Sequence, residues 1–415
     1  MSEKNNKYTP NLSFPEFTGE WEEKTLGEVC DSILTGFPFK GEDITDDASG
    51  HPILRAFSIG EGIIRHGKDY DKYYPYDAEK LKKYEVRKGD IVISMDGSVG
   101  KNIALISEKE ERNLLIQRVA RLRITDYPIH LIFQQIISQR FKDYAAGEKK
   151  GAVIAHISQK QIELFPIYIP NSPAEQQKIA SCLSTMDDLI AAQAEKVEVL
   201  KEKKTGLMQQ LFPQSGETTP RLRFPEFTGE WEVKKLGEVA SSFSGGTPKS
   251  SESKYYGGDI PFIRSGEIHG CKTELYITEE GLNKSSAKLV SKGDLLIALY
   301  GATSGEVAIS KIDGAINQAI LCVRSQSINS NYLCNYLEYK KDTITSKFLQ
   351  GGQGNLSSDI IMSLNIPSPS PTEQEKIASC LSALDDQIAA ETEKITALKD
   401  YKKGLMQQLF PQPAK

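Results

Sequence analysis

The sequence predicts an α+β protein in which two tandem-repeated globular α/β domains are separated by two long antiparallel coiled-coil helices. Two observations within the 415 residues carry this prediction. A long stretch with a seven-residue apolar repeat occurs twice, and a separate set of short motifs recurs at nearly the same spacing. Internal repetition at this scale indicates duplication of a whole structural unit.

The stretch Ser172–Gln214 predicts one long helix. Ser172 suits the N-cap, Pro173 suits the first helical position, and Glu175 completes a capping box. Pro213 ends the pattern. Between these signals, residues recur in alternating steps of four and three, which is the seam of a coiled coil. The seam positions are Ile179, Leu183, Met186, Ile190, Gln193, Val197, Leu200, Lys204, Leu207 and Leu211.

The same helix pattern returns 198 positions later, from Ser370 to Gln412. Both copies place a polar residue at one seam position, Gln193 and Glu391, and lysine at another, Lys204 and Lys402. Polar seam residues specify register and partner orientation. Because the units are related by tandem duplication, we expect the two helices to pair with each other in antiparallel orientation.

The duplication extends beyond the helices. Phe14–Glu22, FPEFTGEWE, returns unchanged as Phe224–Glu232, and the frame resumes at Lys88-Gly89-Asp90 and Lys292-Gly293-Asp294. Residues 30–87 and 240–291 share little. We therefore expect a first globular domain over 14–171, a spacer helix over 172–214, a second globular domain over 215–369 and a second spacer helix over 370–412.

Each Lys-Gly-Asp triplet predicts a turn into a buried strand. A Gly-rich loop follows, Met95–Gly100 in the first copy and Tyr300–Gly305 in the second, and then another apolar strand. Later in each copy, amphipathic helices are expected at 129–146 and 331–349, each ending in a further Gly-rich loop. A constant frame that holds variable inserts indicates two domains of one fold with different surfaces.

Bulk composition excludes several classes of protein. No apolar run is long enough to span a membrane, and the N-terminus lacks the apolar core of a secretory signal. Six cysteines are scattered without a Cys-x-x-Cys pair, so we expect neither disulfides nor structural zinc, and a cytoplasmic location. The net charge is −5, yet residues 61–150 carry 18 Lys/Arg against 14 Asp/Glu, so a local basic face is compatible with an acidic whole.

Catalytic and cofactor motifs are missing from the sequence. It contains no Walker loop, no GxGxxG after a strand, no HExxH, no GxSxG and no methyltransferase Pro-Pro box. The histidines, including His66, His156 and His269, have no metal-ligand spacing. The sequence contains two Asp-Asp pairs, Asp187-Asp188 and Asp385-Asp386. The two members of each pair point about 100° apart on a helix, so they cannot share one catalytic site. We expect no metal, no cofactor and no catalysis by this chain.

Polar loops at matched positions of the duplicated frame favour phosphate binding, because small residues admit phosphates to backbone amides and Lys or Arg supply charge. We expect Arg118, Arg121 and Arg123 to alternate on one strand face, and Tyr73, Tyr74 and Tyr76 either to stack on bases or to belong to the core. The candidate DNA-binding residues are Lys40, Arg65, Lys68, Lys101, Arg118, Lys149, Lys150, Thr247, Lys249, Lys254, Tyr255, Arg264, Lys272 and Thr303.

Together the motifs resemble the specificity (S) subunit of type I restriction–modification systems. The Pro-x-x-Glu-Gln boxes at Pro173 and Pro371 carry the resemblance, with the Lys-Ile-Ala-Ser-Cys-Leu and Asp-Asp runs that follow them. The closing Gly-Leu-Met-Gln-Gln-Leu-Phe-Pro and the opening Phe-Pro-Glu-Phe, Trp-Glu and Leu-Gly-Glu-Val complete it. The resemblance covers the chain from about Phe14 to Gln412.

The resemblance implies two target-recognition domains, each reading one half of a bipartite site on double-stranded DNA. It also implies two methyltransferase (M) subunits docked on the spacer helices and two restriction/translocase (R) subunits. Both kinds of partner subunit would carry the catalysis. Two other interpretations remain: a coiled-coil scaffold that joins proteins without reading DNA, and an enzyme with an unrecognised carboxylate site.

Overall fold

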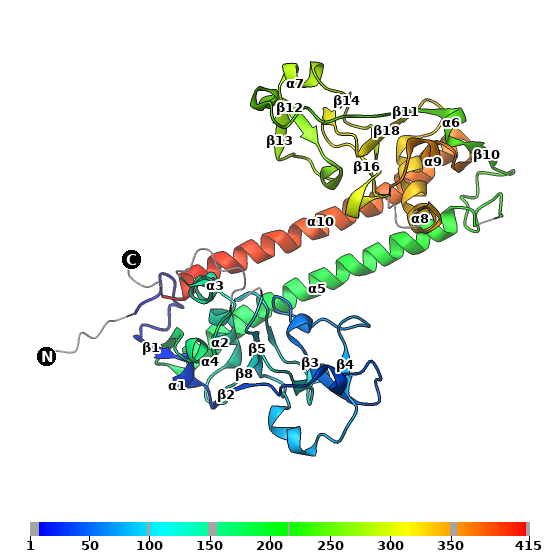
Figure 1. The fold of residues 1–415 in the computed structure, drawn as a ribbon. Coiled ribbons are helices and arrows are strands. Elements are labelled where there is room, and N and C mark those ends of the chain that lie inside the picture. The colour runs from blue at the N-terminus through cyan, green and yellow to red at the C-terminus, as the bar shows by residue number, and fades with distance from the viewer. Residues whose placement is uncertain (1–7, 98–99, 148–155, 215, 349–354, 412–415) are drawn as a thin grey trace. The chain divides into compact units, whose positions relative to one another are not determined.

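The computed structural model describes residues 8–97, 100–147, 156–214, 216–348 and 355–411. The chain divides into two compact units. The first combines Met1–Ala192 with Ile395–Lys415, and the second is Gln193–Lys394. Each long helix therefore contributes one part to each unit (Figure 1). None of the described helices has the length and apolar character needed to cross a membrane.

The globular part of the first unit contains a four-stranded antiparallel sheet in the order β2-β8-β5-β6, a three-stranded sheet β4-β3-β7, and the pair β1-β9. The strands are β1 Trp21–Thr25, β2 Ser32–Thr35, β3 His51–Leu54, β4 Lys72–Tyr74, β5 Ile91–Ser94, β6 Ile103–Leu105, β7 Leu114–Leu115, β8 Val119–Arg123 and β9 Pro166–Pro170. The helices are α1 Leu26–Val29, α2 Ile129–Ile136, α3 Gln139–Ala146 and α4 Gln159–Glu163.

The second unit repeats this plan with a larger second sheet. Its sheets are β11-β18-β15-β16, β13-β12-β17-β14 and the pair β10-β19. The strands are β10 Glu232–Lys235, β11 Ala240–Ser244, β12 Tyr256–Ile263, β13 Leu275–Ile277, β14 Lys288–Val290, β15 Leu295–Ala298, β16 Val307–Ile309, β17 Gly314–Ile316, β18 Ile320–Ser325 and β19 Asn365–Ser368. The helices are α6 Leu236–Val239, α7 Glu279–Asn283, α8 Ser330–Phe348 and α9 Ser358–Met362.

The Lys-Gly-Asp triplets form the predicted turns into buried strands. Gly89 and Gly293 adopt φ of 88° and 97°, positive values that residues with a side chain rarely adopt. Every residue of β5 and β15 is buried. These strands occupy matching central places in the two main sheets, as the duplicated frame predicts.

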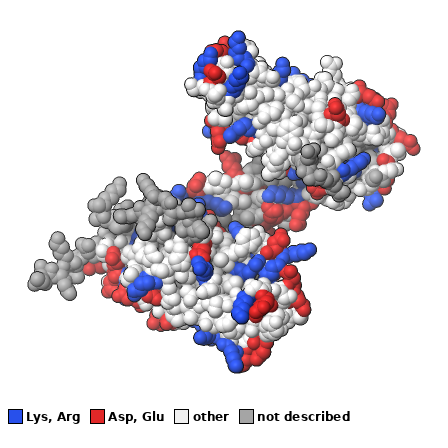
Figure 2. Space-filling model, viewed as in Figure 1, with Lys and Arg blue, Asp and Glu red and all other residues white. Residues whose placement is uncertain are grey.

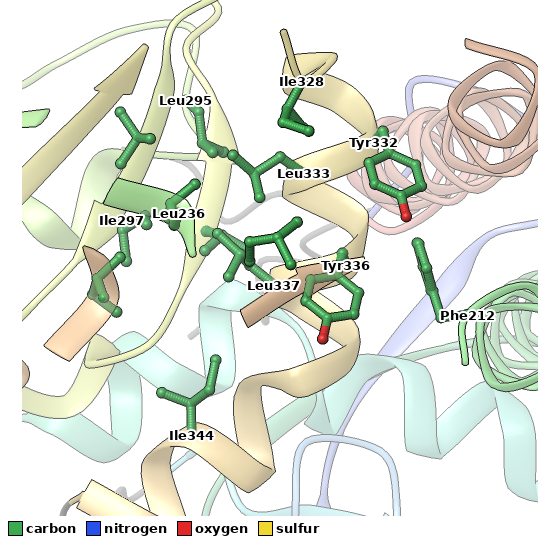
Figure 3. Close-up of a cluster of buried hydrophobic side chains, with 14 of the residues drawn as sticks. Phe212, Leu236, Leu295, Ile297, Ile328, Tyr332, Leu333, Tyr336, Leu337 and Ile344 are labelled. Carbon is green, nitrogen blue, oxygen red and sulfur yellow. The ribbon is translucent and has the colours of Figure 1, made fainter. Parts of the chain in front are cut away.

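The amphipathic helix expected over 129–146 is two helices rather than one. α2 ends at Ile136 and α3 begins at Gln139, because the Ser138 hydroxyl accepts a hydrogen bond from the Phe141 amide and caps a new helix. In the second unit the equivalent stretch is the single helix α8. Its Tyr332 and Tyr336 rings face Phe212, while Leu333 points toward Leu295 of the sheet (Figure 3).

The two long helices are α5, Pro173–Leu211, and α10, Pro371–Leu409. Each begins at the predicted proline and ends before the Phe-Pro pair, since the residue preceding proline disfavours helical geometry. All the predicted seam positions are buried or half-buried. In the first unit Leu183 of α5 shares a core with Leu409 of α10, and Asp187 pairs with Lys402. In the second unit Gln193 contacts Glu391 and Lys204 pairs with Asp385, so within each unit the two helices run antiparallel.

The repeated FPEFTGEWE motif attaches each domain to the start of a long helix. Phe14 lies 4.7 Å beneath the Lys178 ammonium and Phe224 lies 5.2 Å beneath Lys376. The same two lysines pair with carboxylates of the motif, Glu16 in the first copy and Glu226 in the second. The motif is therefore explained by packing within the fold.

Candidate nucleic-acid interface

Each globular domain contains the same cluster of loops beside its central strand, here called the loop cluster. In the first domain the Met95 amide donates to Arg118 O, and the Ile157 amide donates to Met95 O, both at 2.9 Å. In the second domain the Leu299 amide donates to Ala319 O at 2.8 Å, and the Leu356 amide donates to Leu299 O at 2.9 Å. Two copies of one backbone arrangement thus present the side chains around it.

The side chains on this shared backbone differ between the domains. In the first domain Asp96 follows Met95, Arg118 precedes β8, and His156 precedes Ile157. Strand register places Tyr300, Ala319 and Asn355 at the corresponding positions of the second domain. The first loop cluster therefore carries a carboxylate, a guanidinium and an imidazole at three positions where the second carries uncharged side chains.

The acidic member of the first loop cluster is held by both of its neighbours. Asp96 Oδ2 accepts a hydrogen bond from Arg118 Nη1 at 2.8 Å, and Oδ1 lies 2.6 Å from His156 Nδ1. Partial burial works to raise the pKa of Asp96, but the hydrogen bonds from His156 and Arg118 outweigh it and lower the pKa. The carboxylate is ionised at neutral pH, and the Arg118 side chain remains 62% exposed.

The second loop cluster uses neutral polar groups. Thr247 Oγ1 donates to Gln318 Oε1 at 2.6 Å. This hydrogen bond joins the loop after β11 to the turn before β18, next to Ala319. Gln318 is exposed, and its counterpart in the first domain, Gln117, is exposed too. Thr303 lies half-buried in the short 3₁₀ turn Gly301–Thr303 of the same cluster.

Several glycines of the polar loops serve packing rather than an approach to phosphate. A Cβ on Gly36 would lie 2.2 Å from Ile116 O, and one on Gly245 would lie 1.8 Å from Ile316 O. A Cβ on Gly246 would lie 2.6 Å from Ser286 Cβ. The loops after β2 and β11 therefore need glycine in order to pack closely against adjacent segments of the same domain.

The other predicted residues divide by their contacts. Lys68, Lys101, Lys249 and Lys272 are exposed cations for which the described residues offer no direct ion-pair partner, and Lys40 lies 3.6 Å from the exposed Glu42. Lys254 pairs with Glu280 at 2.7 Å and lies over the ring of the half-buried Tyr255. Lys149 and Lys150 lie outside the described residues.

Two predicted arginines are tied into their own domains. Arg264 binds both Glu267 and Glu274, with its Nε 3.0 Å from Glu267 Oε2. Arg65 lies 5.9 Å from the Tyr70 ring centroid. Both side chains contribute charge to the surface, but part of the charge of Arg264 is already neutralised.

Arg121 and Arg123 do not belong to an exposed strand face. Arg121 is 4% exposed and donates to the carbonyls of Lys83 and Glu85. Arg123 forms a two-bond pair with Asp90, at 2.8 and 2.7 Å, and Arg324 repeats it with Asp294 in the second domain. The expected alternation with Arg118 is wrong, because Arg118 lies before the strand in a left-handed conformation with φ of 69°.

An aromatic contact that sequence reasoning missed lies next to Arg65. Phe57 is 62% exposed, and its ring stacks on Tyr70 at 5.2 Å with an interplanar angle of 21°. A single phenylalanine in a loop resembles a core residue in sequence, so no local signal marks it as exposed. Of the three tyrosines considered for stacking, Tyr73 and Tyr74 are half-buried in β4, and Tyr76 is 57% exposed.

Charge on the visible face is mixed. Figure 2 shows Lys and Arg interspersed with Asp and Glu over both units, without one continuous basic surface in this view. In the second unit a cavity of about 430 Å³ is lined by Arg223, Trp231 and Glu373, among other residues. Two of its charged residues neutralise each other, since Arg223 Nε and Nη2 donate to Glu373 at 2.7 and 2.9 Å. Among the described residues no group of three His, Cys, Asp or Glu side chains could hold a metal ion.

Comparison with known proteins agrees with this duplicated architecture. The chain is 27% identical to the type I restriction enzyme MjaVIII specificity subunit of Methanocaldococcus jannaschii, over 98% of this chain and 95% of that one. It is 28% identical to the type I restriction enzyme EcoR124I/EcoR124II specificity subunit of Escherichia coli, over 59% of this chain and 60% of that one. The crystal structure of the type I restriction–modification system S subunit from M. genitalium has the same fold, with a TM-score of 0.58, 17% identity, and coverage of 98% of this chain and 100% of that one.

The model of the type I restriction modification DNA specificity domain matches residues 18–202 and again residues 228–400. Each match contains one globular domain and most of the long helix that follows it. The two matches together cover most of the chain, and they repeat the duplication seen in the sequence and in the sheets. The chain therefore belongs to the family of type I restriction modification DNA specificity domains.

Proposed function

We propose that the chain is the non-catalytic DNA-specificity subunit of a type I restriction–modification complex, in which each globular domain reads one half of a bipartite site on double-stranded DNA. The observation that supports this most directly is the loop cluster. One backbone arrangement, fixed by equivalent hydrogen bonds, carries Asp96, Arg118 and His156 in one domain and different side chains in the other. A constant frame with variable polar side chains suits two independent readers of base edges.

The proposal extends to the parts and partners of the complex. The globular domains at 14–171 and 215–369 are the target-recognition domains, and the helices at 172–214 and 370–412 set the spacing between the half-sites. Two methyltransferase subunits dock on these helices, and two restriction/translocase subunits join them in the cytoplasm. The long paired helices, with polar outer faces along almost 40 residues each, suit a spacer that also offers docking surface.

Exposed cations of the two domains supply the sequence-independent part of DNA binding. In the first domain these are Lys40, Lys68 and Lys101, with Arg65 beside the Phe57–Tyr70 stack. In the second they are Lys249, Lys272 and Lys254, with Thr247 and Thr303 as neutral phosphate contacts. Such contacts fix the position on the duplex and make the affinity depend on salt.

The test is an exchange of segment 30–165 for the same segment of a relative with a different site. The full chain is assembled with its methyltransferase partner, and the methylated sequence is mapped. We expect one half-site to change while the other half-site and the gap remain. A change in both half-sites would contradict independent reading. If the assembled complex binds every duplex with the same affinity, whatever its sequence, the proposed function itself is contradicted.

A further inference from the structure

Arg118 combines three properties that no other cation among the described residues of the first domain has together. Its guanidinium is oriented by a carboxylate, with Nη1 2.8 Å from Asp96 Oδ2. Its backbone adopts φ of 69°, a left-handed conformation that is unfavourable for a non-glycine residue. Its side chain is nonetheless 62% exposed, so the remaining donors face solvent.

The surroundings of Arg118 are built from three separate parts of the chain. Asp96 comes from the loop after β5, Arg118 from the turn before β8, and His156 from the segment before α4. His156 Nδ1 lies 2.6 Å from the second oxygen of Asp96, so that the carboxylate is held from the side opposite Arg118. An arginine held in this way loses less side-chain entropy when it binds, because its planar fork is already oriented.

The fold does not need these charges. At the equivalent positions of the second domain Tyr300, Ala319 and Asn355 occupy the same hydrogen-bonded backbone, and Ala319 lacks the positive φ. The strained backbone of Arg118 and its ion pair with Asp96 are therefore particular to the surface of the first domain. Strain that the frame does not require is characteristic of functional positions.

We infer that Arg118 recognises a guanine in the half-site read by the first domain, with Asp96 as the residue that positions it. The guanidinium donates to O6 and N7 of the base in the major groove, the two-bond geometry by which arginine distinguishes guanine from the other bases. This assignment rests on the proposed function. It also implies that the second domain, with Ala319 at the equivalent position, makes no such contact there.

The decisive variant is Arg118→Lys, assembled as full chain with the methyltransferase partner. Lysine keeps the positive charge that a phosphate contact would use, but it loses the planar fork. Competitor duplexes with each base pair of the site changed in turn measure the preference at every position. We expect the preference to fall about 5- to 150-fold at one G·C pair of the first half-site, while the salt slope and the second half-site remain unchanged.

Arg112→Lys is a matched control, because Arg112 is also an exposed arginine with φ of 69° in the same domain but lies outside the loop cluster. It should leave every base preference unchanged. Asp96→Asn should weaken the preference at the same G·C pair by a smaller factor than Arg118→Lys, since the amide oxygen still accepts one hydrogen bond from the guanidinium.

A measurement on the unaltered protein keeps the inference testable if the variants do not assemble. Replacing each guanine of the first half-site by 7-deazaguanine removes the N7 acceptor from one base at a time. One such replacement should weaken binding, and this penalty should be lost in Arg118→Lys. If no replacement weakens binding, or if Arg118→Lys preserves every base preference, Arg118 is not the guanine reader. If the unaltered complex shows no sequence preference at all, the proposed function fails, and the assignment fails with it.

Discussion

Lys204 of α5 places its Nζ 2.8 Å from Oδ1 of Asp385 on α10. The repeat-related residues make the same contact in the first unit, where Lys402 pairs with Asp187. The lysine in each seam therefore neutralises the first aspartate of the Asp-Asp run on the other helix. The run that resembles a catalytic dyad in sequence is half of an interhelical ion pair.

The first prediction concerns this buried lysine, which is 8% exposed and also lies 2.8 Å from Glu338. Burial works to lower the pKa of Lys204, but the Asp385 and Glu338 carboxylates outweigh burial and raise the pKa. Replacing both carboxylates, in Glu338→Gln with Asp385→Asn, leaves a buried ammonium without an ionic partner. We expect this double variant to lower the free energy of unfolding, measured by urea denaturation of the full chain, by about 3 kcal/mol.

Adding Lys204→Met to that double variant provides the control. The apolar side chain removes the unpaired charge and suits a seam position, so most of the lost stability should return. If Lys204→Met causes a further loss instead, the lysine stabilises the seam through something other than these two carboxylates.

The second prediction concerns a buried carboxyl that lacks the partner present in the other copy. Glu373 is bound by Arg223, whereas its counterpart Glu175 is 2% exposed and has serine, Ser13, at the position equivalent to Arg223. Burial raises the pKa of Glu175 above its usual 4.5, and the Trp21 indole offsets this only in part. The folded state therefore loses stability as pH rises from 4.5 through the folded pKa.

Glu175→Gln should accordingly raise the melting temperature at pH 7 and have little effect below about pH 4, where the carboxyl is protonated in both states. Ser13→Arg should also stabilise the chain at pH 7 by supplying the missing guanidinium, with Ser13→Ala as the neutral control. Glu373→Gln should do the reverse of Glu175→Gln, since it leaves Arg223 without its carboxylate. Equal effects of the two Gln variants at pH 7 would contradict the asymmetry.

The third prediction compares the repeated pairs Arg123–Asp90 and Arg324–Asp294. In the first pair the side chains are 20% and 2% exposed, and in the second they are 47% and 13% exposed. Removing one partner of a buried pair costs more than removing one partner of an exposed pair. We expect Asp90→Asn to lower the free energy of unfolding by about 3 kcal/mol and Asp294→Asn by about 1 kcal/mol, measured by denaturant titration. A larger loss for Asp294→Asn would show that exposure does not govern these pairs.

The fourth prediction separates two lysines of the second domain that sequence alone treated alike. Lys249 is exposed without a direct ion-pair partner among the described residues, whereas Lys254 already pairs with Glu280 at 2.7 Å. Lys249→Ala should reduce the slope of log affinity against log salt by about 0.9 without changing the preferred sequence. Lys254→Ala should reduce it by less, because the lysine must release Glu280 before it can bind a phosphate. An unchanged slope for Lys249→Ala would remove this residue from the DNA contacts.

The sequence determined those helices and turns that depend on residues close together in the chain. The seven-residue period placed the seams of α5 and α10, Pro173 and Pro371 marked where they begin, and the Lys-Gly-Asp triplets marked the turns into β5 and β15. The duplication was visible because both copies retain the residues that attach each domain to its helix, such as Phe14 and Phe224. A polar residue at Gln193 and Glu391 indicated a specified register, and these two residues contact each other.

Only the tertiary structure decided which polar side chains remain exposed on the surface. Arg118, Arg121 and Arg123 are nearly adjacent in sequence, yet Arg121 and Arg123 are bound within the domain while Arg118 faces solvent. Asp96, Arg118 and His156 meet because backbone hydrogen bonds bring three distant segments together. Such contacts depend on strand order and register, which the short-range periodicity of the sequence does not encode. Arg118 was a candidate from the sequence alone, but its contact with Asp96 and the exposure of Phe57 could not be recognised before the fold was known.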